Sequence, residues 1–339
     1  MDKKNTKIGV VGAGSWGTAL ANLLSVNGFD IDLWVYETEV CEQIKNEREN
    51  KVFLPGFTLE KNLYPTNDVE KAVKDKDIIL LVVPSHLMRE TCNTISKMVS
   101  KESIIITASK GIENVTHLTM IDIIRETISH IPEKNLCALS GPSFAKEVAQ
   151  KLPTVVTVAS KDIDVAEHIQ HVFANPYFRV YTNDDTVGVE LGGAIKNVIA
   201  IAAGITDGLG LGLNTRAALI TRGLVEMKRL GDALGANPHT FAGLSGVGDL
   251  LLTCTGSLSR NHTVGLKLGS GKKLKEILSE MRMVAEGVKT TKSVYNLSRK
   301  LGVELPICEE IYNILYDDED PKVSVQRLMT RALNTEIYS

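Results

Sequence analysis

Short apolar runs alternate with longer mixed segments through the first half of the chain. The runs predict β-strands, which occupy residues 7–13, 30–37, 77–83, 103–108, 135–140, 154–159 and 178–182. Several are continuously apolar, which is typical of parallel strands covered on both faces. Helical periodicity fills the intervals, as in 18–28 and 85–100. The pattern therefore predicts an α/β fold with a doubly wound parallel sheet.

The second half has a different pattern, because the strand-like runs stop after about residue 185. Helical periodicity then covers residues 187–204, 214–235, 262–269, 289–301, 305–316 and 321–333. Gly287 and Gly302 are placed like helix ends, and Pro306 like a first-turn residue. We expect a sheet-containing domain over residues 1–186 and an all-helical, substrate-binding domain over residues 187–339. No linker rich in Pro, Gly or Ser separates them, which favours close packing and a binding cleft between them.

One predicted helix, VELGGAIKNVIAIAAG at 189–204, carries a single cation, Lys196, in an almost entirely apolar segment. At helical spacing Lys196 shares a face with Gly192, Gly193 and two alanines. Such small residues indicate a close approach, and a groove in which Lys196 donates a proton to a small ligand while Asn197 adds a hydrogen bond. The alternative is a lysine that extends to water or pairs with a carboxylate such as Glu190.

The sequence GAGSWG at 12–17 follows the first predicted strand directly and opens a helix. In that context a G-x-G-x-x-G is a fingerprint for a dinucleotide. Gly12 allows the tight turn, Gly14 lets the backbone approach a pyrophosphate, and Gly17 lets helix and strand pack closely. The first domain is therefore predicted to be of the Rossmann type, with the phosphates at the helix N-terminus.

The end of the second predicted strand bears on which nicotinamide is bound. The acidic Glu37 favours the free ribose hydroxyls of NAD, and Tyr36 is placed to lie against the adenine. No basic residue follows within a few positions, although Lys45 and Arg48 lie further along. The alternative role of Glu37 is that of a solvated surface charge.

Polar residues also follow later strands. Lys110 lies in TASKGIE after the run at 103–108, and SGPSFAKE follows the run at 135–140. Ligands of open α/β sheets bind beyond the carboxyl ends of the strands. Lys110 is therefore placed to touch cofactor or substrate; a solvated loop charge is the alternative.

A further polar cluster lies at 243–265. It places Asp249 among glycines and sets Ser259, Arg260 and Asn261 just before a helical pattern. Serine or asparagine caps a helix N-terminus, and arginine binds oxyanions with two hydrogen bonds. The cluster indicates an anion-binding corner suited to a phosphate, with an ordinary capped helix as the alternative.

Composition excludes several classes of protein. The 38 basic and 41 acidic side chains give a formal net charge of −3, which offers no electrostatic case for a nucleic-acid or membrane partner. No window approaches the ~20 apolar residues of a membrane span, and no signal-peptide pattern opens the chain. The 5 cysteines are scattered without a C-x-x-C pair. That argues against disulfides or a metal site and favours buried thiols in the cytoplasm.

The chain contains, in this order between about residues 7 and 330, the motifs GAGSWGTALA, VVPSH, SKGIE, SGPSFAKE, LGGAIKNVIAIAAG, SGVGDLLLTCTGSLSRN and VAEGVKT. Together they closely resemble the bacterial NAD(P)-dependent glycerol-3-phosphate dehydrogenases. The resemblance implies hydride transfer from NAD(P)H that reversibly reduces dihydroxyacetone phosphate to sn-glycerol 3-phosphate, for glycerophospholipid biosynthesis in the cytoplasm. It implies a C-terminal domain like that of 6-phosphogluconate dehydrogenase, and it leaves open whether the chain forms a homodimer.

The same resemblance implies that Lys196 transfers the proton. The cofactor contacts that it implies are Gly12, Gly14, Ser15, Trp16, Gly17, Tyr36, Lys110, Ala145, Arg260, Val284 and Glu286. The implied substrate contacts are Lys110, Gly141, Ser143, Lys196, Asp249, Ser259, Arg260 and Asn261. Position 36 departs from the family pattern, because NADP-preferring members often carry a basic or imidazole side chain where this chain has Tyr36. The preference between NAD and NADP therefore stays open.

Two other functions remain as alternatives. A reductase of the same architecture that acts on a 3-hydroxy acid or ketopantoate would not need the Ser-Arg-Asn corner. A non-catalytic NAD(P)-sensing protein would have no use for Lys196 in a groove of small residues. Three influences would act on the pKa of Lys196: burial and Lys110 lower it and Asp249 raises it. The sequence does not rank them.

Overall fold

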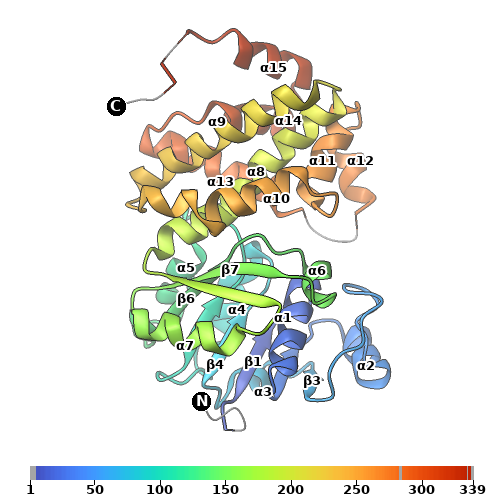
Figure 1. Ribbon diagram of the computed structural model, residues 1–339, viewed down its shortest axis with the longest axis vertical. Helices are drawn as coiled ribbons and strands as arrows, with labels where there is room; N and C mark the ends of the chain where they lie inside the picture. Colours follow the sequence, from blue (N-terminus) through green and yellow to red (C-terminus); the bar gives the residue numbers. More distant parts are fainter. Residues whose placement is uncertain (1–4, 282–284, 334, 337–339) are drawn as a thin grey trace.

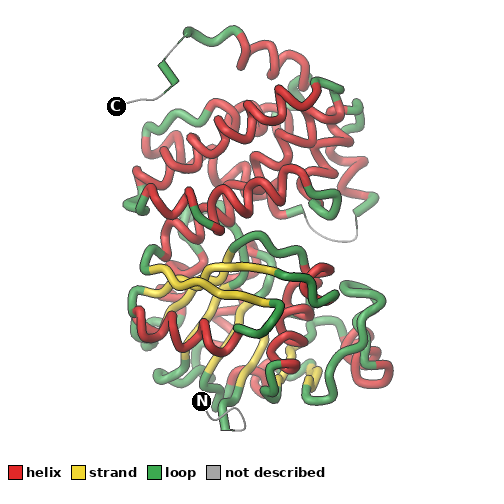
Figure 2. The backbone as a smooth tube through the Cα atoms, in the orientation of Figure 1, coloured by secondary structure: helices red, strands yellow, loops and turns green. Residues whose placement is uncertain are grey.

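The computed structural model describes residues 5–281, 285–333 and 335–336. Its first half is built on an 8-stranded sheet with the strand order β3-β2-β1-β4-β5-β6-β7-β8 (Figures 1 and 2). The doubly wound sheet is confirmed, and every predicted strand is present within a few residues of its expected range. The strands are β1 (Ile8–Val11), β2 (Ile31–Trp34), β3 (Leu63–Thr66), β4 (Ile78–Leu81), β5 (Ile104–Thr107), β6 (Leu136–Ser140), β7 (Thr154–Ser160) and β8 (Phe178–Asn183).

Two features of the sheet differ from the prediction. The pattern does not predict β3, because its sequence LYPT is short and contains Pro65, which cannot donate a ladder hydrogen bond; the protein places this strand at the sheet edge. The sheet is also not wholly parallel, since β7 pairs antiparallel with β6 and β8 runs parallel to β7. Only the short helix α6 (Ala145–Ala149) lies between β6 and β7, so the chain reverses instead of crossing the sheet.

Helices cover both faces of the sheet, because successive residues of a strand point to opposite sides. Ile8 and Val10 of β1 pack with Leu20 in one apolar core, whereas Val11 of β1 and Leu81 of β4 belong to another. The helices of this half are α1 (Ser15–Val26), α2 (Thr38–Glu47), α3 (Val69–Val73), α4 (Met88–Ile95), α5 (Met120–Thr127), α6 and α7 (Ile163–Phe173).

The second half is helical, as predicted, and lies beyond one end of the sheet (Figure 1). The pattern does not predict α10 or α12, which are short. Gly302 ends α13 with a φ of +67° and Pro306 begins α14, as expected, whereas Gly287 lies in the first turn of α13. The helices are α8 (Thr186–Gly208), α9 (Gly212–Ala233), α10 (Asp249–Thr255), α11 (Arg260–Gly269), α12 (Leu274–Ser279), α13 (Glu286–Leu301), α14 (Pro306–Tyr316) and α15 (Pro321–Met329).

The long helix α8 lies at the centre of the second half. It is the one helix among the described residues that is long and apolar enough to cross a membrane, yet its most apolar window is 100% buried inside the protein. A helix that is apolar nearly all round is typical of the core of a large domain. Its apolar character is therefore accounted for by packing against the other helices.

Helices α8 and α11 approach so closely that their backbones touch. A β-carbon on Gly265 of α11 would lie 2.0 Å from the carbonyl oxygen of Ile201, and one on Gly204 of α8 would lie 2.1 Å from that of His262. Any side chain at either position would push the helices apart. The contact therefore fixes the start of α11, at Arg260, relative to α8.

We predict that Gly265→Ala lowers the free energy of unfolding by about 1–3 kcal/mol, because the added methyl group overpacks the contact. Urea denaturation followed by circular dichroism measures this change. Ser270→Ala, at the exposed end of α11, is the matched control and should change the stability by less than about 0.5 kcal/mol. Equal stability of the two variants would contradict the proposed backbone contact.

Candidate active site

The turn after β1 is shaped by glycines. Gly12 has a φ of +113°, and a β-carbon there would lie 2.7 Å from the carbonyl oxygen of Val82. A β-carbon on Gly17 would lie 1.9 Å from the Gly12 carbonyl oxygen, whereas one on Gly14 would have no atom within 4 Å. The helix α1 begins at Ser15, so its N-terminal end faces this open space. The turn therefore has the shape and the dipole that a dinucleotide pyrophosphate requires.

Of the two aromatic residues expected to contact the nucleotide, Tyr36 is exposed and Trp16 is partly buried. The indole nitrogen of Trp16 is buried and has no hydrogen-bond partner among the described residues. The ring of Tyr36 is 78% exposed and lies edge-on against Trp34, with 6.0 Å between the ring centres. Glu37 is exposed. It lies three residues after the end of β2 and directly before α2. Tyr36 and Glu37 are therefore both accessible to the ribose and adenine of a dinucleotide.

The centre of the site is a buried carboxylate shared by two lysines. Asp249, the first residue of α10, is 1% exposed. One of its oxygens accepts from Lys196, and the other accepts from Lys110 at 2.6 Å. Lys196 also donates to the hydroxyl of Thr253 at 3.0 Å, and Lys110 to the carbonyl of Gly141 at 3.4 Å. The helix α8, the loop after β5 and α10 thus meet at one charged cluster.

The pKa values follow from burial and from these charges. Burial lowers the pKa of Lys196 to about 8; Asp249 acts in the opposite direction, and Lys110 adds to the lowering. Burial is the largest of the three influences. Burial alone would raise the pKa of Asp249, but Lys110 and Lys196 together lower it below its ordinary value. The cluster therefore joins a stable carboxylate to an ammonium group that titrates near neutral pH.

The alternative partner for Lys196 is wrong. Glu190 lies about 120° away from Lys196 around the helix axis, since they are six residues apart, and it accepts instead from the backbone N–H of Ile121 at 2.9 Å. Burial raises the pKa of Glu190 to about 7. Lys196 does not extend to water either, because it is 6% exposed. The compensating charge for the lysine comes from Asp249, which lies 53 residues along the chain.

The two glycines beside Lys196 admit protein atoms. A β-carbon on Gly192 would lie 2.2 Å from the carbonyl oxygen of Ser245, in the π-helical turn Leu244–Gly248 that leads into α10. A β-carbon on Gly193 would lie 3.4 Å from the aliphatic stem of Lys110. The expected close approach is therefore present, but the atoms that approach belong to the protein, so these two glycines do not form the expected groove for a ligand. They admit instead the segments that carry Asp249 and Lys110.

Sequence reasoning missed Thr253. Its hydroxyl accepts from Lys196 and donates to the carbonyl oxygen of Asp249 at 2.6 Å. The signal was available, because Thr253 follows Asp249 by four residues and so shares its helix face. It was missed because the pattern does not predict the short helix α10.

Gly141, Ser143 and Ala145 follow β6. Gly141 has a φ of +139°, and its carbonyl oxygen accepts from Ser143 at 3.0 Å as well as from Lys110. Ala145 is the first residue of α6. The turn therefore places the Gly141 carbonyl at the lysine cluster, and α6 begins four residues further along the chain.

The predicted anion-binding corner forms the start of α11. Ser259 caps this helix by accepting from the backbone N–H of His262 at 3.2 Å. Arg260 is exposed, and within the described ranges it forms no ion pair. Asn261 donates to Asn197 at 2.9 Å and accepts from the N–H of Gly287 at 3.0 Å. The corner thus combines a helix N-terminus with an available guanidinium group.

Glu286 begins α13 and links this corner to the sheet. It accepts from the backbone N–H of Ser85 at 3.4 Å, after β4. Burial raises the pKa of Glu286, while the charge of Arg260 acts in the opposite direction. Val284, also expected at the cofactor, lies outside the described residues. The described groups include a turn suited to a dinucleotide, a buried ammonium group with a lowered pKa, and a helix N-terminus with an exposed arginine. Such a set of groups suits the interconversion of a carbonyl and an alcohol.

Comparison with known proteins bears on this site. The family model described as NAD-dependent glycerol-3-phosphate dehydrogenase N-terminus matches residues 7–166, and its C-terminal counterpart matches residues 185–326. The chain is 52% identical over 335 residues, 99% of its length and 98% of the relative's, to glycerol-3-phosphate dehydrogenase [NAD(P)+] of Syntrophobacter fumaroxidans. It matches the crystal structure of glycerol-3-phosphate dehydrogenase from Coxiella burnetii with a TM-score of 0.92 and 38% identity, covering 96% of this chain and 99% of that one.

The fold extends beyond this family. A ketopantoate reductase from Ralstonia eutropha matches with a TM-score of 0.61 but 14% identity, over 93% of this chain and 99% of that one. At that identity the likeness shows the shared fold alone. Architecture by itself therefore does not distinguish a dehydrogenase of glycerol 3-phosphate from a reductase of 3-hydroxy acids or ketopantoate. The residues at the start of α11 must make that distinction.

We predict that Asp249→Asn destabilises the protein by about 3–5 kcal/mol at neutral pH, because it leaves buried lysines without a compensating charge. The pKa of Lys196 should then fall below about 8. When the pKa of a lysine is lower in the folded state than in the unfolded state, the protein loses stability as the pH falls, because the unfolded state binds the proton more tightly. The deficit relative to wild type should therefore be larger at pH 6 than at pH 9. Denaturant titrations at both values measure it; a pH-independent deficit would contradict the charge cluster.

Proposed function

Because the chain belongs to the NAD-dependent glycerol-3-phosphate dehydrogenase family, we propose that it catalyses the reversible reduction of dihydroxyacetone phosphate to sn-glycerol 3-phosphate with NAD(P)H. The observation that carries this proposal is the buried Lys196, which is held by Asp249 and Thr253 at the carboxyl side of the sheet. When bound at the first turn, NAD(P)H supplies the hydride. The other steps belong to side chains of the protein.

Lys196 is the proposed general acid in the direction of reduction. The substrate carbonyl oxygen gains negative charge as hydride arrives, and the Lys196 ammonium donates a proton to it; in the reverse direction the neutral amine accepts the proton. A pKa of about 8 suits both roles near neutral pH. Asp249 orients the ammonium through a charge-assisted hydrogen bond. Its own charge remains fixed, because two lysines lower its pKa.

The phosphate of the substrate is proposed to bind at the start of α11. Arg260 and the helix N-terminus supply donors there, with Ser259 and Asn261 beside them. Binding energy from the phosphate then orients the carbonyl carbon, which is remote from it. Gly141, Ser143 and Lys110 complete the proposed substrate contacts. This corner is what distinguishes the proposal from a reductase of 3-hydroxy acids or ketopantoate.

The proposed cofactor contacts lie around the first turn and at the junction of the two halves. The position of Tyr36 is exposed and uncharged, which supports binding of NAD without excluding NADP, since Lys45 follows in α2. The proposed contacts are Gly12, Gly14, Ser15, Trp16, Gly17, Tyr36, Lys110, Ala145, Val284, Arg260 and Glu286.

We also propose that the enzyme acts in the cytoplasm and supplies glycerophospholipid biosynthesis. The five cysteines are all buried and unpaired, which supports a reducing compartment. The boundary between the cofactor-binding and substrate-binding domains is proposed at residues 186 and 187, where α8 begins. A homodimer is compatible with these features. Analytical ultracentrifugation decides the assembly, since a monomer has a mass of 37.0 kDa and a homodimer has twice that mass.

We predict that Lys196→Met lowers kcat by roughly 10²-fold or more while NADH still binds, as measured by quenching of protein fluorescence. In the wild type, reduction requires the protonated lysine. Its kcat/KM should therefore fall about tenfold per pH unit above a pKa of about 8, and the rate of oxidation should rise to a plateau there. A near-normal kcat in the variant would overturn the role of Lys196. Absence of turnover in the wild type would favour a non-catalytic sensor.

We predict that Arg260→Ala raises KM for dihydroxyacetone phosphate by roughly 10- to 100-fold, since a charge-assisted contact to the phosphate is lost. Unphosphorylated dihydroxyacetone serves as the internal control. At saturating NADH, which offsets any weaker cofactor binding, its kcat/KM should be low in the wild type and unchanged by the substitution. Equal KM values for the phosphorylated substrate in variant and wild type would count against the phosphate corner and favour another reductase of this architecture.

A further inference from the structure

Lys110 stands on a loop, residues 108–119, that joins β5 to α5. Because its ammonium reaches Asp249 at 2.6 Å, small movements of this loop alter the charge cluster. The loop closes on itself, since the N–H of Glu113 donates to the carbonyl of Leu118 at 3.0 Å and that of His117 donates to the carbonyl of Glu113 at 3.1 Å. Glu113, three residues beyond Lys110, is therefore the point at which this loop can be held.

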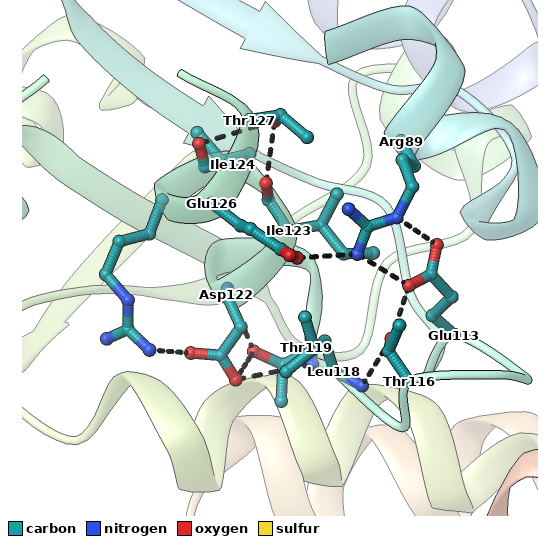
Figure 3. A network of polar contacts seen from close by, with 11 residues as sticks. Arg89, Glu113, Thr116, Leu118, Thr119, Asp122, Ile123, Ile124, Glu126 and Thr127 are labelled. Atoms are coloured by element: carbon teal, nitrogen blue, oxygen red, sulfur yellow. Dashed lines mark hydrogen bonds and ion pairs between the residues drawn. The ribbon is translucent and has the colours of Figure 1, made fainter. Parts of the chain in front are cut away.

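Arg89, in helix α4, holds the loop at Glu113. Arg89 of α4 donates two hydrogen bonds to Glu113, each of 2.8 Å, and the hydroxyl of Thr116 donates to the same carboxylate (Figure 3). The side chains of Arg89 and Glu113 are 30% and 17% exposed, so water screens the pair only in part. The Arg89 hydrogen bonds are the largest influence lowering the pKa of Glu113. Arg89 also reaches Glu126 of α5 at 2.8 Å.

The helical half holds the loop from the other side. The hydroxyl of Ser293, in α13, is buried and donates to the carbonyl of Ile112 at 2.7 Å. The side chain of Ile112 is 4% exposed and packs in the apolar core of the helical half. The backbone between Lys110 and Glu113 is therefore fixed by α4 on one side and by α13 on the other.

We propose that Arg89 and Glu113 are positioning residues for Lys110: their bidentate ion pair holds the loop so that the Lys110 ammonium stays on Asp249. This inference rests on the roles proposed above for Lys110 and Lys196. The charged groups that act most strongly on Lys196 are Asp249 and Lys110, and Lys196 also interacts with the buried carboxyl group of Glu286 in α13. If the ion pair is lost, we expect Lys110 to withdraw from Asp249. The pKa of Lys196 then rises, because the Asp249 carboxylate interacts with Lys196 alone and the positive charge of Lys110 is further away.

Glu113→Gln tests this inference, because it keeps the shape of the side chain and removes its charge. We expect kcat/KM for dihydroxyacetone phosphate to fall roughly tenfold, and the alkaline decline of kcat/KM to move upward by about half a pH unit or more. Glu126→Gln is the matched control, since it removes the other carboxylate from the same guanidinium. It should leave both quantities unchanged within about twofold.

Arg89→Met should reproduce the Glu113→Gln phenotype, and the double variant should be no worse than either single one, as expected of residues that act as a pair. Thermal unfolding of each variant separates a loss of stability from a loss of position. A decline that stays at the wild-type pH in Glu113→Gln, or an equal effect of Glu126→Gln, would overturn the inference.

Lys110→Met separates this inference from the proposed function on which it rests. A large loss of activity in Lys110→Met with none in Glu113→Gln would refute the positioning role alone. Full activity and an unchanged pH profile in Lys110→Met would refute the role proposed for Lys110 itself.

Discussion

The carboxylate of Asp249 is buried, and an unpaired buried charge would cost several kcal/mol. It is satisfied by two ammonium groups from distant segments: Lys196 from the central helix of the helical half, and Lys110 from a loop of the sheet-containing half. The helical half supplies the partner of one carboxylate oxygen, and the sheet-containing half supplies the partner of the other. Completion of the charge cluster and packing of the two halves against each other are therefore coupled.

Close approach of backbones makes this arrangement possible. Gly193 leaves room for the stem of Lys110, and Gly192 admits the backbone of Ser245, which leads into α10. On another part of α8, the glycine contacts with α11 set the distance from Lys196 to the start of that helix. Small residues thus determine the positions of Lys196, the proposed general acid, and of the start of α11, although they take no part in the chemistry themselves. The proton affinity of the lysine then follows from burial, with the two neighbouring charges acting in opposite directions.

Much of the fold was predictable because it is local. Continuous apolar runs predicted all the central strands, and the glycines of the first turn form a short motif that is visible in the sequence, although the Val82 backbone that Gly12 approaches lies far along the chain. β3 escaped prediction because Pro65 is tolerated at a sheet edge, and edge position is a property of the whole sheet. The reversal between β6 and β7 escaped because strand direction depends on how the connecting segment packs. The network around Arg89 escaped for a similar reason, since its ion pair joins residues 24 positions apart.

The sequence by itself determined that Lys196 lies in an apolar helix beside small residues, that a dinucleotide turn precedes it, and that an Arg-containing corner follows it. Periodicity and short motifs carry that information. Only the tertiary structure decided which carboxylate compensates the lysine, that Thr253 joins it, and which influence on its pKa is largest. Compensation of a buried charge is a long-range matter: any carboxylate of the chain is a candidate until packing brings one within hydrogen-bond distance, and here packing chose Asp249 over Glu190.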